Sequence, residues 1–85
     1  MRRLNWPTSQ REWEDLAADL LKANLKLAHM SYVDLERQLG EMGVVDHHKY
    51  ISGKLSRGRF SAAYFLQVLA CTGVEELQIP KPPTP

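Results

Sequence analysis

Apolar residues recur at every third or fourth position along four stretches of the chain, a spacing that is typical of amphipathic α-helices. We expect helices at about residues 10–29, 32–39, 47–56 and 62–72, and residues 74–77 would add one further turn. No stretch alternates apolar and polar residues in the manner of a half-buried strand. The pattern therefore predicts an all-α fold of four to five short helices.

Residues that favour helix ends flank these stretches. A short side-chain oxygen precedes each expected helix and can accept hydrogen bonds from free N–H groups, at Ser9, Ser31, Asp46 and Ser61. An acidic residue lies three positions after Ser9 and another lies three positions after Ser31, which strengthens the prediction that the first two helices start there. Glycines that can take a left-handed conformation stand where helices would end, at Gly40, Gly58 and Gly73.

The same spacing predicts which faces point inward. Ile51 and Leu55 lie four positions apart, so they share one face of the third helix and are expected to be buried. The apolar stripes of the first and last helices are wider and comprise Trp13, Leu16, Ala17, Leu20, Leu21, Leu25, Leu27 and Ala28, then Ala62, Phe65, Leu66 and Leu69. The last helix is apolar on nearly all sides, which is typical of a central helix covered by its neighbours.

Positive charge is concentrated between Lys49 and Phe60. This segment holds four basic residues and no acid, so it carries +4, whereas the whole chain carries +1 and the remainder sums to −3. Such a local concentration is expected of a surface that meets phosphates. The alternative interpretation is an ordinary solvated helix face, in which Gly53 is only a weak helix position.

Length and composition narrow the class of protein. A chain of 85 residues makes one domain near the lower size limit for a self-supporting core, and 44% apolar and 25% charged residues are typical of globular proteins. The expected organisation is an N-terminal arm at residues 1–8, a domain at 9–78 and a proline-rich tail at 79–85. A single cysteine, no signal-peptide pattern and no membrane-spanning apolar run favour a cytoplasmic protein.

The order of these elements resembles the lambda-repressor-like (Xre/Cro-type) helix-turn-helix domain over roughly residues 10–77. The resemblance is carried by apolar and glycine positions at Leu35, Leu39, Gly40, Ile51, Leu55, Gly58, Ser61, Phe65, Leu66 and Leu69. Ten residues separate Gly40 from Ile51, which makes the turn longer than in the common domain. The segments KANLK (22–26) and LSRGRFSAAYFLQ (55–67) also resemble a small uncharacterised bacterial conserved-domain family, which suggests a bacterial origin but no activity.

The helix-turn-helix resemblance implies a transcriptional regulator of a bacterium or mobile element that binds double-stranded DNA. In that family the recognition helix enters the major groove, while the following loop contacts phosphates. The positions that would meet base edges are His48, Lys49, Ser52 and Gly53, and those that would meet phosphates are Lys54, Arg57 and Arg59. Arg2 and Arg3 of the arm would reach the minor groove, although incidental charge explains them equally well. The class usually acts as dimers on paired half-sites, so a homodimer is a further implication.

The histidines and the cysteine form no evident metal-binding or catalytic pattern. His47 and His48 are adjacent, so on a helix they would point about 100° apart. His29 and Cys71 are distant in sequence, and no C-x-x-C or H-x-x-x-H spacing occurs. Cys71 is expected to be a buried inert thiol, and GEMGVV lacks the lysine and preceding strand of a phosphate-binding loop. We therefore expect no metal, no cofactor, no small-molecule substrate and no enzymatic activity.

The alternative function is a protein–protein interaction adaptor without DNA binding. In that interpretation three aromatic side chains would be exposed on the helical bundle and would anchor a partner, namely Tyr50, Phe60 and Tyr64. The two functions differ in their response to salt. A phosphate-driven complex weakens steeply as salt is added, whereas an interface anchored by aromatic side chains does not.

Overall fold

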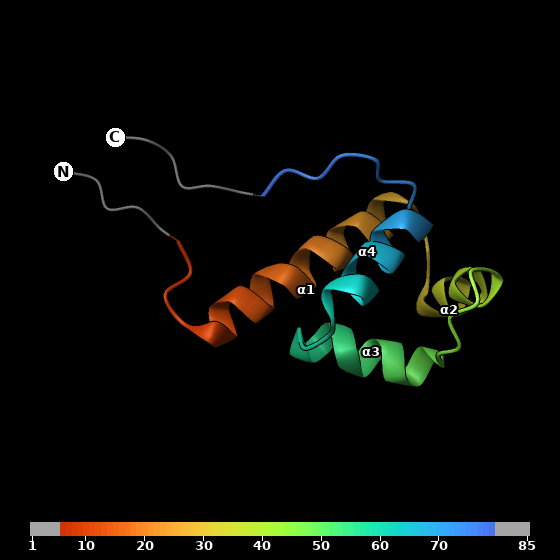
Figure 1. Ribbon diagram of the computed structural model, residues 1–85, viewed down its shortest axis with the longest axis horizontal. Coiled ribbons are helices and arrows are strands. Elements are labelled where there is room, and N and C mark those ends of the chain that lie inside the picture. The colour runs from red at the N-terminus through yellow and green to blue at the C-terminus, as the bar shows by residue number, and fades with distance from the viewer. Residues whose placement is uncertain (1–5, 80–85) are drawn as a thin grey trace.

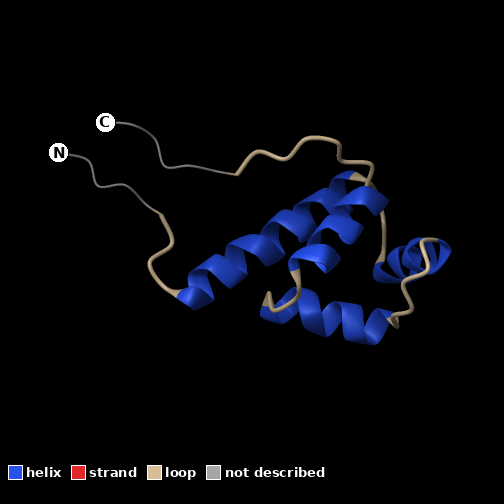
Figure 2. Cartoon of the chain, viewed as in Figure 1, coloured by secondary structure: helices blue, strands red, loops and turns tan. Residues whose placement is uncertain are grey.

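The computed structural model describes residues 6–79 and contains four helices within that range. They are α1 (Gln10–Leu27), α2 (Tyr32–Glu41), α3 (His48–Arg57) and α4 (Ala62–Cys71), as Figure 1 and Figure 2 show. The described residues include no strand, so the predicted all-α class is confirmed. Among these helices none is long and apolar enough to cross a membrane. Most of the predicted arm and tail lies outside the described residues.

The long helix α1 supports two of the other helices. Both α3 and α4 contact α1, and both also contact α2. In Figure 1, α2 is seen nearly end-on while α3 runs across the view, so these two consecutive helices cross steeply. α3 therefore packs its inner face on α1 and α2 and directs its outer face away from the bundle.

The core is made of aliphatic side chains from all four helices. The largest fully buried side chains are Leu21, Leu35, Leu39, Ile51, Leu55 and Val68. The predicted inward positions Ile51, Leu55 and Leu69 are confirmed, with exposed fractions of 0%, 0% and 5%. Burial of each such side chain contributes about 1.5–3 kcal/mol relative to exposure in water. Because α3 buries only Ile51 and Leu55, its orientation also depends on contacts at its two ends.

Three of the predicted N-caps are confirmed and one is wrong. The capping hydroxyls accept backbone N–H groups in the pairs Ser9 with Glu12, Ser31 with Asp34, and Ser61 with Tyr64. α3 is capped by His47, whose Nδ1 accepts the N–H of Lys49 at 3.2 Å. Asp46 lies one residue before this cap. Its Oδ1 accepts the N–H of His47 at 3.0 Å, and its Oδ2 lies 2.9 Å from the ammonium of Lys54.

Glycines end the third and fourth helices as predicted, but not the second. Gly58 and Gly73 follow α3 and α4 with left-handed φ angles of 68° and 78°. Gly40 lies inside α2, and the left-handed turn occurs at Gly43, with a φ of 84°. A glycine weakens a helix by its backbone entropy but does not end it unless the chain must turn at that position.

Several predicted apolar positions are exposed. Leu27 is 77% exposed because α1 ends there, two residues before the predicted end, and His29 turns the chain with a left-handed φ of 55°. Leu66 is 64% exposed, whereas Tyr64 and Val68 of the same helix are buried. A helix that is apolar on nearly all sides does not reveal from its sequence which side faces the core.

The chain after α4 does not form the further helical turn expected at residues 74–77. The left-handed turn at Gly73 redirects the chain, and the N–H of Val74 donates to the carbonyl of Leu69 at 3.2 Å. Val74 and Leu77 then pack against the core. Residues 74–77 therefore lie over the core without forming a helix.

Candidate nucleic-acid interface

α3 presents a row of basic and small residues on the face opposite to the core. Lys49, Gly53 and Arg57 follow one another at intervals of four residues, so they line up along one side of the helix. Lys49 and Arg57 are exposed, whereas Ile51 and Leu55 are fully buried on the other side. We call Lys49, Gly53 and Arg57 the outward ridge.

The side chain of Arg57 folds back along α3 onto Gly53. A β-carbon built on Gly53 would lie 3.4 Å from both terminal nitrogens of the Arg57 guanidinium. The guanidinium thus covers bare helix backbone that a larger residue would occupy. Arg57 is the last residue of α3 and not a loop residue as predicted, so it shares the outward ridge with Lys49.

Arg59 is directed toward α1. Its Nε lies 3.3 Å from a carboxylate oxygen of Glu14. The Glu14 side chain is 14% exposed, whereas that of Arg59 is 68% exposed. A guanidinium has five N–H donors, so a contact through Nε leaves donors for a further anion. Glu14 nevertheless balances part of the positive charge that the sequence assigns to this segment.

Lys54 is engaged within the domain. Its ammonium lies 2.9 Å from the carboxylate of Asp46, whose side chain is 7% exposed, and 4.5 Å from the ring centroid of Tyr64. Burial acts to raise the pKa of Asp46, but the hydrogen bonds from Lys54 and from the His47 N–H outweigh it, so the pKa is lowered. Burial and the Asp46 charge raise the pKa of Tyr64, whose buried hydroxyl makes no hydrogen bond to a described residue. Lys54 thus links α3 to α4 and is less open to a phosphate than its sequence position suggests.

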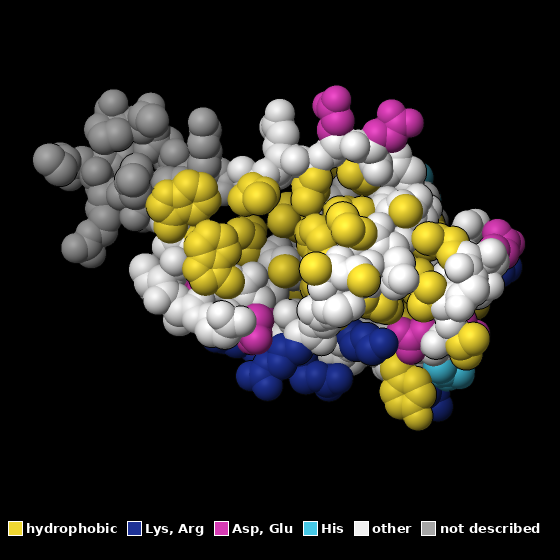
Figure 3. Space-filling model, viewed as in Figure 1, with side chains coloured by type: hydrophobic (Ala, Val, Ile, Leu, Met, Phe, Trp, Pro, Cys, Tyr) yellow, Lys and Arg dark blue, Asp and Glu magenta, His cyan; other side chains and the backbone are white. Residues whose placement is uncertain are grey.

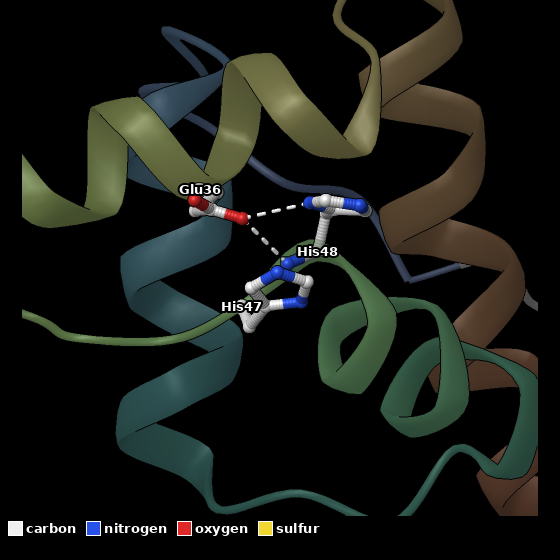
Figure 4. A group of neighbouring side chains, drawn as sticks. All are labelled: Glu36, His47 and His48. Carbon is white, nitrogen blue, oxygen red and sulfur yellow. Dashed lines mark hydrogen bonds and ion pairs between the residues drawn. The ribbon is translucent and has the colours of Figure 1, made fainter.

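His48 is turned toward α2, off the outward ridge. Its Nδ1 lies 2.9 Å from a carboxylate oxygen of Glu36, and the same oxygen accepts the backbone N–H of His48 at 2.7 Å (Figure 4). The hydrogen bond from the backbone N–H of His48 is the main cause of the lowered pKa of Glu36, and the hydrogen bond to the His48 side chain lowers it further. His47 stacks on the His48 ring with centroids 4.2 Å apart. The predicted divergence of the two rings is wrong, because His47 caps α3 with extended backbone angles and is not part of the helix.

The remaining candidates lie beside the ridge or outside the described residues. Ser52 is half-buried, and Arg2 and Arg3 precede the first described residue. Figure 3 shows Lys and Arg side chains gathered along the edge of the molecule where α3 lies, with a few acidic side chains beside them, while other acidic side chains project from the opposite edge. The predicted concentration of positive charge is therefore present as a surface, although Glu14 and Asp46 reduce it.

The aromatic residues expected to form an adaptor surface do not form one. Tyr50 is 70% exposed, but Tyr64 is 6% exposed and Phe60 is half-buried against the core. The expectation is wrong for Tyr64 because α4 turns this residue inward beside Val68. A different apolar groove of about 150 Å³ is lined by Trp13, Leu16, Ala17, Leu20, Phe65, Leu77 and Ile79.

Cys71 is half-buried and not fully buried as predicted. It is the last residue of α4, and its Sγ lies 3.4 Å from the Sδ of Met42, just after α2. Burial is the main cause of the raised pKa of the Cys71 thiol, and the charge of Glu41 raises it further. A raised pKa keeps the reactive thiolate scarce at neutral pH.

Three acids that hydrophobic periodicity does not mark as partners organise this surface. Glu14, Glu36 and Asp46 pair with Arg59, His48 and Lys54, which are 45, 12 and 8 positions away in the chain. Hydrophobic periodicity carries no information about such pairs. The only signal in the sequence is the lack of acids within residues 49–60, which leaves acids elsewhere to supply the partners.

Over residues 6–79, the fold and the site define an all-α domain of four helices with a basic ridge on the third. The chain belongs to the family described as Domain of unknown function (DUF6471), which matches residues 13–77. No curated protein and no solved structure matches the chain. The family description names no activity.

Proposed function

We propose that the protein binds double-stranded DNA by placing the outward ridge of α3 in the major groove, as a transcriptional regulator of the lambda-repressor-like class. The observation that carries the proposal is the row of Lys49, Gly53 and Arg57 on the face opposite to the buried Ile51 and Leu55. When the Arg57 guanidinium moves from Gly53 to a phosphate, the centre of the helix carries no side chain and can approach base edges closely.

The steep crossing of α2 and α3 supports a helix-turn-helix assignment. In that motif two helices meet at a large angle across a turn of about three or four residues, and the second helix reads the groove. Here residues 42–47 connect the two helices, so the turn is longer than usual. α2 then serves as the scaffold helix, held to α3 by the bonds between Glu36 and His48.

The basic residues have distinct roles in this mode of binding. Arg57 offers a planar fork of donors that suits a phosphate, while Lys49 lies one turn before Gly53 and would meet base edges. Arg59 and Lys54 make smaller contributions because Glu14 and Asp46 already balance them. Arg2 and Arg3 would add contacts in the minor groove. A single domain of this size makes a small interface with DNA, so we propose that a homodimer binds paired half-sites in the bacterial cytoplasm.

The test is a salt titration of DNA binding by the full chain, measured by fluorescence anisotropy on a duplex selected from random sequence and on a scrambled duplex. Arg57→Ala is expected to weaken binding to both duplexes and to lower the slope of log affinity against log salt by about one. Lys49→Ala is expected to reduce discrimination between the two duplexes by roughly 1–3 kcal/mol. Lys26→Ala removes one charge from the last turn of α1 and should change neither quantity.

Two outcomes would refute the proposal. If the wild-type chain shows no salt-dependent binding to any duplex at low salt, DNA is not the partner. If it binds but the Lys49 and Arg57 variants match the Lys26 variant, another face of the domain holds the DNA.

A further inference from the structure

The junction of α2 and α3 brings together three side chains that ligate metals in other proteins. Glu36, His47 and His48 each offer one ligand atom, and these atoms all lie within 4.8 Å of one another. Figure 4 shows Glu36 projecting from α2 toward the two histidines at the start of α3. We propose that Glu36, His47 and His48 bind one divalent transition-metal ion such as Zn²⁺, independently of any binding to DNA.

The spacing of Glu36 and His48 is close to that of two ligands in a tetrahedral site. Zn²⁺ binds nitrogen and oxygen ligands at about 2.0–2.2 Å, which places two ligands of a tetrahedron roughly 3.4 Å apart. The Nδ1 of His48 and the nearest oxygen of Glu36 are 2.9 Å apart. Small rotations of side chains therefore convert this pair from a direct hydrogen bond into two ligands of one ion, and any proton on the coordinating nitrogen passes to solvent.

His47 completes the site because it is not part of the helix. Its backbone angles are φ −109° and ψ 142°, and its ring stacks on that of His48 with centroids 4.2 Å apart. Its Nδ1 accepts the N–H of Lys49 at 3.2 Å. Coordination through either ring nitrogen would replace this hydrogen bond. A metal on Nδ1 takes the lone pair that accepts it, and a metal on Nε2 requires the ring proton to move to Nδ1, which then can no longer accept.

The donor set selects the class of metal. The two imidazole nitrogens are borderline ligands, so this set favours Zn²⁺ and its neighbours over Mg²⁺ or Ca²⁺, which prefer oxygen ligands alone. Three protein ligands leave a fourth position for water. The side chains of Glu36 and His48 are 36% and 38% exposed, and His47 is exposed, so an ion can enter from solvent. A bound ion would tie α3 to α2 at the first residues of α3.

The experiment is a calorimetric titration of the tag-free full chain with Zn²⁺. We expect one ion per chain. His47→Ser removes a ligand but keeps a hydroxyl that caps helices well, so the variant should fold and should bind Zn²⁺ at least about tenfold more weakly. Glu36→Gln should also lose affinity. His29→Ala and Cys71→Ser remove the other histidine and the thiol and should bind as the wild type does.

Circular dichroism of each variant will show whether it is folded, and the visible absorption of bound Co²⁺ gives a second readout of coordination by nitrogen. A wild-type chain that takes up no Zn²⁺ would overturn the proposal. A folded His47→Ser variant that binds as tightly as the wild type would also overturn it, as would loss of binding in His29→Ala or Cys71→Ser.

Discussion

Gly58 lies directly against the backbone carbonyl of Glu14, so the end of α3 rests on the first turns of α1. Gly58 is buried and has a left-handed φ of 68°. A β-carbon at this position would overlap the carbonyl of Glu14. The next residue, Arg59, pairs with the carboxylate of the same Glu14. Because α3 buries only two side chains, this contact is one of the restraints that orient the outward ridge.

Gly58→Ala is expected to lower the free energy of unfolding by roughly 2–5 kcal/mol. The left-handed conformation costs a residue with a β-carbon about 1–2 kcal/mol, and the clash with backbone at Glu14 adds a further cost of about 1–3 kcal/mol. Gly43→Ala is the matched control, because Gly43 has a φ of 84° but no atom within 4 Å of its β-carbon position. Urea unfolding of both variants measures the difference. Equal losses would show that the contact between α3 and α1 is not tight.

Leu55→Ala is expected to lower the free energy of unfolding by about 2–5 kcal/mol, because it removes a fully buried side chain and leaves a cavity. Leu66→Ala should change it by only about 0.5 kcal/mol or less, because Leu66 is 64% exposed. Thermal unfolding followed by circular dichroism compares the two. An unchanged midpoint for Leu55→Ala would mean that α3 does not pack on α1 and α2 through this residue.

The ion pair between Asp46 and Lys54 should make stability depend on pH in the acid range. The pKa of Asp46 is lowered in the folded state, so the unfolded state binds its proton more readily. The resulting stabilisation is present above the ordinary value of 3.8 and is lost as pH falls through the lower folded pKa. Asp46→Asn should therefore flatten this part of the profile, measured by urea unfolding between about pH 5 and pH 2.

Lys54→Met should flatten the same part of the pH profile, because it removes the charge that holds Asp46 ionised. Profiles of the two variants that run parallel to the wild-type profile over this range would contradict the assignment. Glu36 and Asp34 also have lowered pKa values and remain in both variants, so the comparison isolates Asp46.

Gly53→Ala should separate stability from DNA binding. Alanine is favoured over glycine inside a helix by about 0.8–1.0 kcal/mol, and the new β-carbon would meet only the flexible end of Arg57 at 3.4 Å. We therefore expect the free energy of unfolding to rise by up to that amount. Affinity for duplex DNA should fall, because the added carbon would remain between α3 and the bases after the Arg57 guanidinium has moved from Gly53 to a phosphate. A stabilised variant with unchanged DNA affinity would show that the helix does not enter the groove at Gly53.

Local sequence determined the existence of the four helices and most of their ends. The caps at Ser9, Ser31 and Ser61 and the turn at Gly58 depend on bonds within about four residues, so short patterns predict them. The burial of Ile51 and Leu55 follows in the same way from their spacing on one helix face.

The tertiary structure alone decided which side of an apolar helix faces inward and which charges remain free. On α4 it buried Tyr64 and exposed Leu66, because the side that meets α1 and α2 depends on the packing of all four helices. It also paired Arg59 with Glu14 and His48 with Glu36, across separations of 45 and 12 residues. Such contacts depend on how the helices cross and not on the spacing of residues along the chain. For this reason the sequence located the basic segment, while the fold selected Lys49, Gly53 and Arg57 as its outward ridge.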